Sequence, residues 1–510
     1  MKRYNNIPTL AKQGCLGLAL MLSACSEPAP ETDVTTAALV QQMLANMGGL
    51  DAIGKVDSLV QRGAGTREHL GQIPVTEGSD PTATLNNLVE TIDLRNARAA
   101  FDNDVVIGAG FSQHRTEVLT RLRGQPVAWG TTAGRPRQAT SVNGLFSWAT
   151  QNSPEFLLRR NIIAVVRAAA RVAPEQRAQE RVINGLPYWY GQTRTDDGEA
   201  IGLFFDQDSG LLAGYLTLDT EPMLGDKEAL YLLDDYRQVD GLLLPFWLEI
   251  MKGDEPWATI QYDSISLNDA EALRIFELPG DVLEQAGQVL ASDGSWVPLQ
   301  WHPVTATVSQ VEAFSHHSMV VEFPDFVVVV EGPYTEGQSL TLVRQVEERI
   351  GKPVRYVVPT HPHYDHTGGI RGLASAGATV LVAAGHEAEL RQLVESPHSN
   401  PPDALARQIR AGAEVGRVEV FSGMTEVADG GQALFLYELS GIPHVEPMVL
   451  AYVPGAGVLF QSDLFFGAPG ADASALYDAI ASLGLQVTTL VGGHGGVLSY
   501  SALETAVNGN

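Results

Sequence analysis

A chain of 510 residues is too long for a single hydrophobic core, so its length predicts at least two domains. The apolar fraction of 45% and the charged fraction of 18% are typical of folded globular proteins and exclude a disordered or fibrous chain. The 33 basic and 60 acidic residues leave a net charge of −27, which disfavours polyanionic partners. We therefore expect no nucleic-acid partner.

The two cysteines, Cys15 and Cys25, both lie close to the N-terminus. The folded domains that follow therefore contain no disulfide and no thiolate metal ligand. Any transition-metal site in them must be built from imidazole and carboxylate groups.

The first 24 residues have the pattern of a bacterial export signal. Lys2 and Arg3 begin a positive segment, and an apolar stretch follows from Leu16 to Leu22. The sequence Leu-Ser-Ala-Cys at 22–25 resembles the lipobox of bacterial lipoprotein signal peptides. The resemblance implies a signal peptide over residues 1–24 and lipidation of Cys25. The alternative is a plain secretory signal that is cleaved at an Ala-x-Ala-like site.

Ser26 follows the cysteine, where an Asp would resemble an inner-membrane retention signal. The resemblance therefore implies an outer-membrane location that faces the periplasm or the exterior. The apolar stretch before Cys25 is too short for a transmembrane helix, and no later segment has the pattern of one. We expect the lipid to be the membrane anchor.

Residues 25–36 are rich in Pro, Glu, Ala and Thr, a composition that predicts a flexible tether. An N-terminal β-rich domain is expected over residues 37–285. It opens with helical spacing from Ala37 to Leu50 and continues with short alternating runs that are typical of hairpins. The Ala/Arg-rich stretch from Asn161 to Val182 has helical spacing, and we expect it to form a helix that covers one face of the sheet.

Several short motifs of this region resemble the curved half-barrel of periplasmic lipoprotein-carrier domains. They are Phe205-Asp206, Asp235-Tyr236-Arg237, the turn from Gly241 to Pro245, and Phe276-Glu277-Leu278-Pro279. In that family the concave sheet cradles acyl chains. A structural platform or an oligomerisation domain is the alternative, and the oligomeric state stays open.

Residues 303–510 alternate apolar strands with helical segments, which predicts an α/β domain. A helix is expected to end at Ile350. The expected strands are Met319 to Val330, Val354 to Val358, Thr379 to Ala383, Ala433 to Leu439, Met448 to Val453 and Leu459 to Gln461. The predicted fold class is thus an α/β domain preceded by a β-rich, half-barrel-like domain.

One of these strands runs directly into a cluster of polar side chains. His361, His363, Asp365 and His366 follow the strand Val354 to Val358 within a few residues, and a glycine pair and a helical run come next. Packing does not explain this cluster, because His and Asp are costly to bury without partners. Imidazole and carboxylate groups at this spacing predict a metal site.

The pattern H-x-H-x-D-H resembles the signature of the metallo-β-lactamase superfamily, and the resemblance extends over about residues 303–510. Three further positions match that family: His444 after a strand, Asp463 at the end of the strand that begins at Leu459, and His494 in a late Gly-His motif. The resemblance implies a four-layer αββα sandwich and a site for two metal ions.

The implied ligands are His361, His363 and His444 for the first metal ion. The second ion would take Asp365, His366 and His494, with Asp463 bridging the two. Zinc is the expected metal, and iron or manganese could occupy the same ligands.

Two divalent cations that share a water lower its pKa and generate a hydroxide nucleophile. The expected reaction is therefore hydrolysis of a small-molecule substrate by a hydroxide that bridges the metals, with Asp365 as a catalytic residue that orients it. Asp463 stands where the best-known zinc β-lactamases carry Cys or Ser. This residue favours the branch that hydrolyses carboxylic esters, lactones or thioesters.

Three alternatives stay open at this stage. The first is β-lactam hydrolysis, and the second is sulfur dioxygenation at a single iron. The third is a non-catalytic protein that binds acyl chains or lipoproteins. His363 stands where the di-iron flavoproteins of the superfamily carry Glu, which argues against oxygen reduction. Substrate-binding residues cannot be assigned from the sequence.

Other polar residues receive structural interpretations. Glu331, at a position where many family members carry Asp, is expected to support the ligands or the fold. His316 and His317 are expected in a surface turn between strands, although they could line the cleft. His69, His114, His386 and His398 have no partners at ligand spacing and are interpreted as structural.

Overall fold

The computed structural model describes residues 33–68, 82–107, 111–132, 137–140, 161–183, 185–195, 198–253, 255–291, 297–313, 316–332 and 334–509. The expected signal peptide 1–24, the expected lipidation site Cys25, most of the expected tether 25–36 and His69 lie outside the described residues, so these stay predictions. Among the described residues, no helix is both long and apolar enough to span a membrane.

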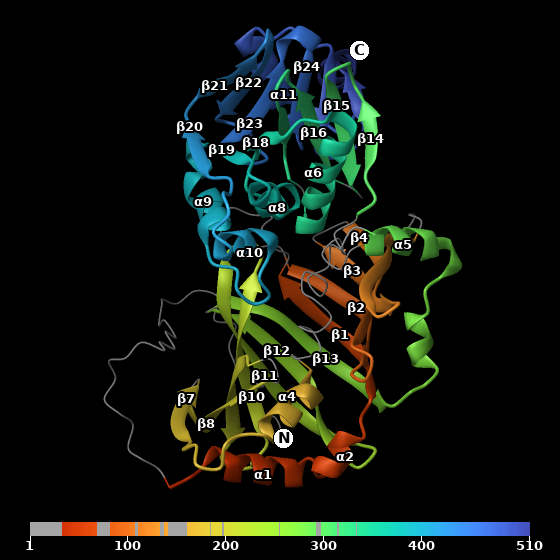
Figure 1. Ribbon diagram of the computed structural model, residues 1–510, viewed down its shortest axis with the longest axis vertical. Coiled ribbons are helices and arrows are strands. Elements are labelled where there is room, and N and C mark those ends of the chain that lie inside the picture. Colours follow the sequence, from red (N-terminus) through yellow and green to blue (C-terminus); the bar gives the residue numbers. More distant parts are fainter. Residues whose placement is uncertain are drawn as a thin grey trace.

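The N-terminal half is built on one large antiparallel sheet, which lies below the C-terminal domain in Figure 1. Its order is β6-β5-β4-β3-β2-β1-β13-β12-β11-β10-β9-β8-β7, so neighbours are sequential hairpins except where β1 pairs with β13. The strands are β1 Ser58–Glu68, β2 Thr82–Asp93, β3 Arg98–Ile107, β4 Phe111–Leu122, β5 Gln125–Thr132, β6 Gln138–Thr140, β7 Gln179–Ile183, β8 Leu186–Arg194, β9 Ala200–Asp206, β10 Leu212–Glu221, β11 Gly225–Val239, β12 Leu242–Lys252 and β13 Glu255–Leu267. The expectation of a β-rich N-terminal half is confirmed.

Helices α1 (Thr36–Asn46), α2 (Leu50–Gly54) and α4 (Ile162–Ala169) pack against this sheet. The Thr35 side chain caps α1 by accepting a hydrogen bond from a backbone N–H of its first turn. The expected helix over 37–50 is therefore present but ends earlier, at Asn46. Gly48 follows with φ +111°, and a Cβ there would meet the Gly241 carbonyl oxygen at 2.5 Å.

The expected helix over 161–182 is wrong beyond its first third. Only Ile162–Ala169 is helical, and Gln179–Ile183 forms β7, which pairs with β8. Pro174 lies between the two segments, and its ring and missing N–H disfavour continuing the helix. Strand pairing with β8 then outweighs the helical spacing of the residues after Pro174.

A short helical segment leads from the N-terminal sheet to the C-terminal domain. It consists of η2 Ala272–Phe276, η3 Gly280–Val282 and α5 Leu283–Ala291. Phe276, Val282 and Ala286 pack against Trp129 and Ala139 of β5 and β6. This segment therefore covers the β6 end of the large sheet.

The C-terminal domain contains two sheets. The first has the order β14-β15-β16-β17-β18-β19-β20, with β17 to β20 parallel, and the second has the order β21-β22-β23-β24-β25-β26. The first is made of β14 Gln300–Pro303, β15 Val308–Ala313, β16 His316–Glu322, β17 Val327–Val330, β18 Val354–Val358, β19 Thr379–Ala383 and β20 Val418–Phe421. The second is made of β21 Met424–Asp429, β22 Gln432–Leu439, β23 Met448–Val453, β24 Val458–Ser462, β25 Thr489–Gly492 and β26 Val497–Ser499. The strand expected over 319–330 is thus a hairpin of two strands.

Helices cover the outer face of each sheet. They are α6 Glu336–Ile350, α8 Ile370–Ser375, α9 Glu387–Glu395 and α10 Ala404–Arg410 on the first sheet, and α11 Ala471–Leu483 and α12 Tyr500–Asn508 on the second. The short segments α7 Tyr364–Thr367, η4 Ala384–His386 and η5 Pro454–Ala456 follow β18, β19 and β23 in the chain. Three apolar clusters separate the layers. One lies between the two sheets, one between the first sheet and α6, α8, α9 and α10, and one between the second sheet and α11 and α12. The αββα architecture is therefore confirmed.

The hairpin between β10 and β11 joins the two halves of the molecule. Asp226 accepts hydrogen bonds from the backbone and the side chain of Ser399, and its own N–H donates to the Pro397 carbonyl at 2.8 Å. Asn400 donates to Glu199 and to the Leu218 carbonyl, both at 2.7 Å. The loop 396–403 of the C-terminal domain is therefore held against the N-terminal sheet.

Arg371 fixes the other side of that loop. Its guanidinium forms a bidentate pair with Asp403 and donates to the carbonyls of Leu393, Val394 and Ser396. Arg371 is buried, with 5% of its surface exposed. The five hydrogen bonds of this side chain therefore join the end of α9 to the loop 396–403.

We predict that Arg371→Ala lowers the free energy of unfolding of the C-terminal domain by about 3 kcal/mol, because it leaves the partly buried Asp403 without its counter-charge. Chemical denaturation followed by circular dichroism measures the change. The matched control is Arg391→Ala, which removes exposed pairs with Glu387 and Glu395 on α9 and should cost only about 0.5 kcal/mol. Equal effects of the two variants would contradict the role of Arg371.

Candidate metal centre

The sequence directs a buried strand into a tight polar loop. Strand β18 ends at Val358, and residues 361–366, which we term the histidine loop, follow after Pro359 and Thr360. The loop closes on itself through a hydrogen bond from the His366 N–H to the His363 carbonyl and one from the Thr367 hydroxyl to the same carbonyl. Its side chains are therefore fixed at the end of the parallel strands, where ligands of α/β sheets gather.

The first group of side chains contains His361, His363 and His444. One ring nitrogen from each lies within 4.8 Å of the others, and His361 Nε2 lies 3.0 Å from His363 Nδ1. His361 and His363 are buried, whereas the His444 side chain is 24% exposed. Three imidazoles that converge from one side in this way can hold one metal ion.

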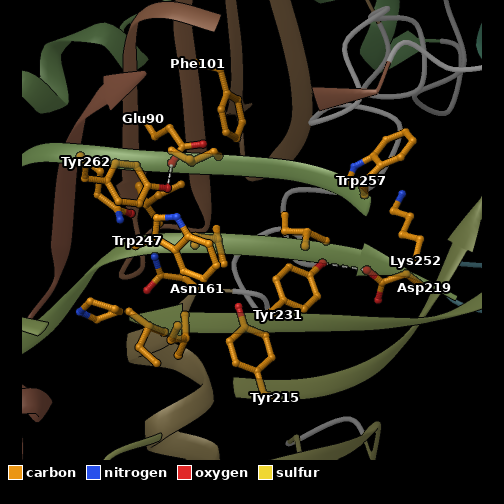
Figure 2. Close-up of a pocket in the computed structure, with 18 residues that line it drawn as sticks. Glu90, Phe101, Asn161, Tyr215, Asp219, Tyr231, Trp247, Lys252, Trp257 and Tyr262 are labelled. Carbon is orange, nitrogen blue, oxygen red and sulfur yellow. Dashed lines mark hydrogen bonds between the residues drawn. The ribbon is translucent and has the colours of Figure 1, made fainter. Parts of the chain in front are cut away.

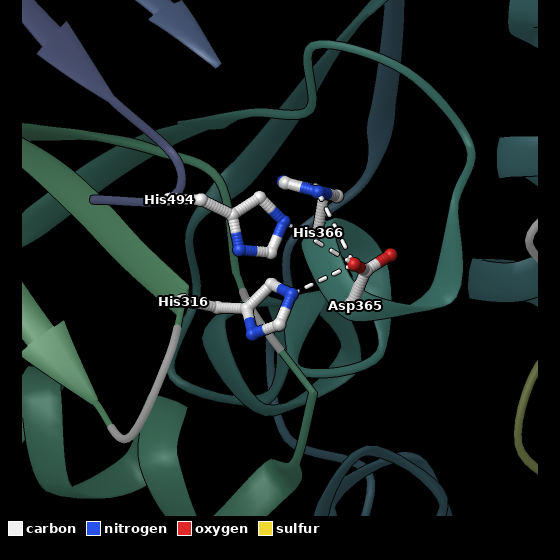
Figure 3. Close-up of side chains that lie close together, drawn as sticks. All are labelled: His316, Asp365, His366 and His494. Carbon is white, nitrogen blue, oxygen red and sulfur yellow. Dashed lines mark hydrogen bonds and ion pairs between the residues drawn. The ribbon is translucent and has the colours of Figure 1, made fainter. Parts of the chain in front are cut away.

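The second group contains His316, Asp365, His366 and His494, again with one ligand atom each within 4.8 Å of the others (Figure 3). Asp365 Oδ2 lies 2.7 Å from His316 Nε2 and 3.5 Å from the Nε2 atoms of both His366 and His494. Figure 3 shows the three rings directed toward this carboxylate. The second group can therefore also hold a metal ion.

Asp463 lies between the two groups, immediately after β24. Its Oδ2 is 3.3 Å from His444 Nε2 and 3.2 Å from His366 Nε2, and its Oδ1 is 3.5 Å from His494 Nε2. One carboxylate thus contacts members of both groups. The structure therefore brings together all seven side chains that the sequence pattern singled out.

Glu331 supports the site from beneath. It is fully buried, and its Oε2 accepts a hydrogen bond from His366 Nδ1 at 2.8 Å, which directs Nε2 of that ring toward the carboxylates. Its Oε1 accepts from the hydroxyls of Thr360 and Ser462, both at 2.5 Å. Second-shell carboxylates of this kind fix the tautomer and orientation of ligand histidines. The expectation that Glu331 supports the site is confirmed.

Backbone strain is concentrated at the same place. Glu331 and Ser462 have φ values of +66° and +53°, which non-glycine residues rarely adopt. Such conformations cost about 1–3 kcal/mol each and persist where surrounding contacts fix them. Gly493 must stay without a side chain, because a Cβ there would lie 2.8 Å from the Glu331 Oε2.

The two aspartates of the site are ionised. Burial alone would raise the pKa of Asp365 and of Asp463, but the neighbouring histidines lower both well below the usual value. Burial lowers the pKa of His363 to about 4 and lowers that of His361 well below its usual value. These two imidazoles are therefore neutral at pH 7, as metal ligands must be.

His366 and His494 have the opposite shift. Burial favours their neutral forms, but Asp463 and its neighbouring carboxylates raise the pKa of His366 well above its usual value, and Asp365 and Asp463 raise that of His494 to about 9. The carboxylates thus favour positive charge at the centre of the site, and either a proton or a metal ion supplies it.

The donor atoms themselves fit a metal ion. Nε2 of His366 and Nε2 of His444 are buried, yet neither forms a hydrogen bond of good geometry within the described residues. Both lie near the same oxygen of Asp463. A buried polar atom without a hydrogen bond is costly, and metal ions held at the two groups would satisfy both nitrogens.

His316 corrects an expectation from the sequence. We expected a surface turn at His316 and His317, but both lie in β16 and are 4% and 5% exposed. His316 contacts Asp365 and packs against the ring of His494 at 3.7 Å between centroids. Burial lowers its pKa to about 3, so the ring is neutral. The adjacent pair of histidines before an apolar run was the signal that could have placed it in a strand.

The other histidines behave as the sequence suggested. His386 Nε2 contacts the Pro447 carbonyl at 2.6 Å, His398 lies 3.5 Å from Asp403, and His114 pairs with Asp104 on the surface. None of these three lies among the potential metal-binding groups of the described residues.

The αββα fold and the converging histidines and aspartates define a domain with a candidate metal centre. Residues 311–494 match the family described as "Metallo-beta-lactamase superfamily". This segment is therefore a metallo-beta-lactamase superfamily domain, and members of that superfamily are in general metal-dependent hydrolases.

Solved structures of three metallo-beta-lactamases are similar to about two-fifths of the chain. The enzyme from Pontibacter korlensis has 18% identity and a TM-score of 0.32, and the match covers 41% of this chain and 98% of that enzyme. FIM-1 from Pseudomonas aeruginosa, in its mono-zinc form, has 17% identity, a TM-score of 0.33, and coverages of 42% and 95%. The enzyme from Hirschia baltica has 16% identity, a TM-score of 0.31, and coverages of 41% and 96%.

We predict that His316→Ala lowers the metal affinity of the second group by about 10- to 100-fold, because Asp365 loses the partner that orients it and the group loses one nitrogen donor. Metal content per chain, measured by plasma mass spectrometry after dialysis against a graded chelator, gives the affinity. His317→Ala removes the neighbouring buried histidine from the opposite face of the same strand and serves as the control. An unchanged metal content in His316→Ala would show that the ring has only a packing role.

Metal binding should also release protons at neutral pH. His494 of the metal-free protein has a pKa of about 9, so it is protonated at pH 7, and a metal ion must displace that proton. The apparent affinity should therefore rise with pH up to about 9 and then level off. Calorimetry of zinc binding in buffers of different ionisation enthalpy counts the protons. If zinc binding released no proton at pH 7, the raised pKa of His494 would be contradicted.

Proposed function

We propose that the protein is a di-zinc hydrolase that cleaves a carboxylic ester, a lactone or a thioester. The observation that carries the proposal is the position of Asp463, whose two carboxylate oxygens lie within 3.5 Å of histidines from both groups. A carboxylate in this position can bridge two cations. The first ion would be held by His361, His363 and His444, and the second by Asp365, His366 and His494.

Nitrogen and oxygen donors without thiolate suit zinc, although iron and manganese accept the same set. When bound, two such cations supply Lewis acidity toward a carbonyl oxygen and lower the pKa of water. The remaining chemistry belongs to the chain itself. Asp365 is ionised and would orient the attacking water by accepting a hydrogen bond from it, and His316 holds its Oδ2 at 2.7 Å.

The exposed members of the site indicate where a substrate enters. The side chains of His444 and His494 are each 24% exposed, whereas the other ligand candidates are buried. Phe466 lies beside this opening, 59% exposed, with its ring 5.9 Å from that of His494. An exposed aromatic ring at the opening supports a substrate that carries an apolar group next to the scissile carbonyl.

We expect about two zinc ions per chain and a hydrolysis rate that is lost on chelation and restored by zinc. Asp463→Asn should lower kcat/KM by more than 100-fold, because the loss of second-shell groups alone costs about 10- to 100-fold. His302→Gln, which removes a surface histidine that pairs with Glu312, should leave the rate unchanged. A panel of ester, lactone, thioester and β-lactam substrates identifies the bond.

Three other outcomes of these measurements would contradict the proposal, and each would indicate a different function. Turnover of the β-lactams alone would make the protein a β-lactamase. One iron per chain with oxygen-dependent oxidation of a sulfur substrate would indicate a dioxygenase. Two metal ions without turnover of any panel member would favour a binding protein.

A further inference from the structure

The N-terminal sheet contains a cavity of about 120 Å³ that the metal centre does not use. Its walls come from β1 to β3, from β10 to β13 and from the start of α4 (Figure 2). A single buried water needs roughly 10–15 Å³. The cavity therefore has room for part of an organic molecule.

Most of the wall is apolar or aromatic. Phe101, Trp247 and Trp257 line the cavity, and the stacked rings of Tyr215 and Tyr231, 4.6 Å apart, form another side (Figure 2). Water gains few hydrogen bonds against such walls, whereas a flat apolar molecule gains dispersion and stacking contacts. The cavity is therefore suited to a ligand with a ring-shaped or conjugated body.

The polar groups of the wall are arranged so that little net charge faces the cavity. Glu90 is 7% exposed, and burial raises its pKa, which favours the uncharged acid beside the Tyr262 hydroxyl at 2.5 Å. Asp219 accepts hydrogen bonds from Thr217 and Tyr231, both at 2.8 Å. Lys252 lies over the Trp257 ring at 3.9 Å, and burial lowers the pKa of its ammonium group.

These groups disfavour charged ligands of either sign. A carboxylate ligand would meet the acidic side chain of Asp219. A cationic ligand would compete with Lys252, which already occupies the face of an aromatic ring. An uncharged ligand avoids both costs.

One polar atom of the wall has no hydrogen bond within the described residues. Trp257 is 6% exposed, and its Nε1 is buried without an acceptor. Figure 2 shows this ring at one end of the cavity, with its nitrogen on the cavity side. A buried indole N–H normally has an acceptor, so a carbonyl or hydroxyl oxygen of a ligand would complete it.

We propose that this cavity is a binding site for an uncharged, largely apolar molecule with an aromatic or polycyclic body and a carbonyl or hydroxyl oxygen. The oxygen accepts a hydrogen bond from Trp257 Nε1, and the body lies against Trp247, Tyr215 and Tyr231. The site is separate from the hydrolytic centre, and its occupancy does not depend on metal ions.

The test uses prodan, an uncharged naphthalene ketone whose fluorescence reports its surroundings. We expect saturable binding to the full protein, with the same affinity before and after chelation of metal ions. Leu248→Trp places a large ring in the cavity wall and should weaken binding at least tenfold. Leu218→Trp, the same substitution at a 42% exposed position of the sheet, should leave it unchanged. Circular dichroism and thermal unfolding check that both variants fold.

A second variant tests the proposed hydrogen bond. Trp257→Phe keeps an aromatic ring but removes the N–H, and it should weaken prodan binding about three- to tenfold. Palmitate and a quaternary ammonium ligand serve as charged competitors against an uncharged aromatic ketone. Non-saturable fluorescence, wild-type affinity in Leu248→Trp, or stronger displacement by either charged competitor would overturn the proposal.

Discussion

The site depends on the mutual attraction between two buried aspartates and the histidines around them. Asp365 and Asp463 are 6% exposed, and their negative charges would be too costly at this depth without nearby positive charge. The histidines can supply that charge only by holding protons, as His366 and His494 do in the metal-free protein. Metal ions bound by the same carboxylates would compensate their charge and release the protons. The affinity of the site for cations is therefore a consequence of how deeply its carboxylates are buried.

The αββα frame makes this arrangement possible because its strands end at one edge. Glu331 follows β17, the histidine loop follows β18, and Ser462 is the last residue of β24. Left-handed backbone at Glu331 and Ser462 turns the chain there, and the hydrogen bond between their side chains joins the two sheets. The rigid apolar core between the sheets offsets the local strain.

How much the sequence could predict depended on how local each feature is. The histidine loop was predictable because its four polar residues are contiguous and follow an apolar strand. His316 was missed because its contact with Asp365 joins residues 49 positions apart, which no local pattern encodes. The helix expected over 161–182 failed for a related reason, since β7 depends on its pairing with β8. The pairing of β1 with β13 spans about two hundred residues and was equally beyond local patterns.

The contact between the two halves suggests a reason for their fusion in one chain. Met223 lies in the hairpin between β10 and β11. Its sulfur accepts a hydrogen bond at 3.7 Å from the hydroxyl of Thr367, the residue that directly follows the histidine loop. Tyr364 of that loop is buried, and burial together with the nearby Glu221 raises its pKa well above the usual value. The N-terminal sheet therefore covers the back of the loop that carries His361 to His366. Because a metal site requires ligands held within a fraction of an ångström, this sheet contributes to the precision of a centre whose donors all lie in the other domain.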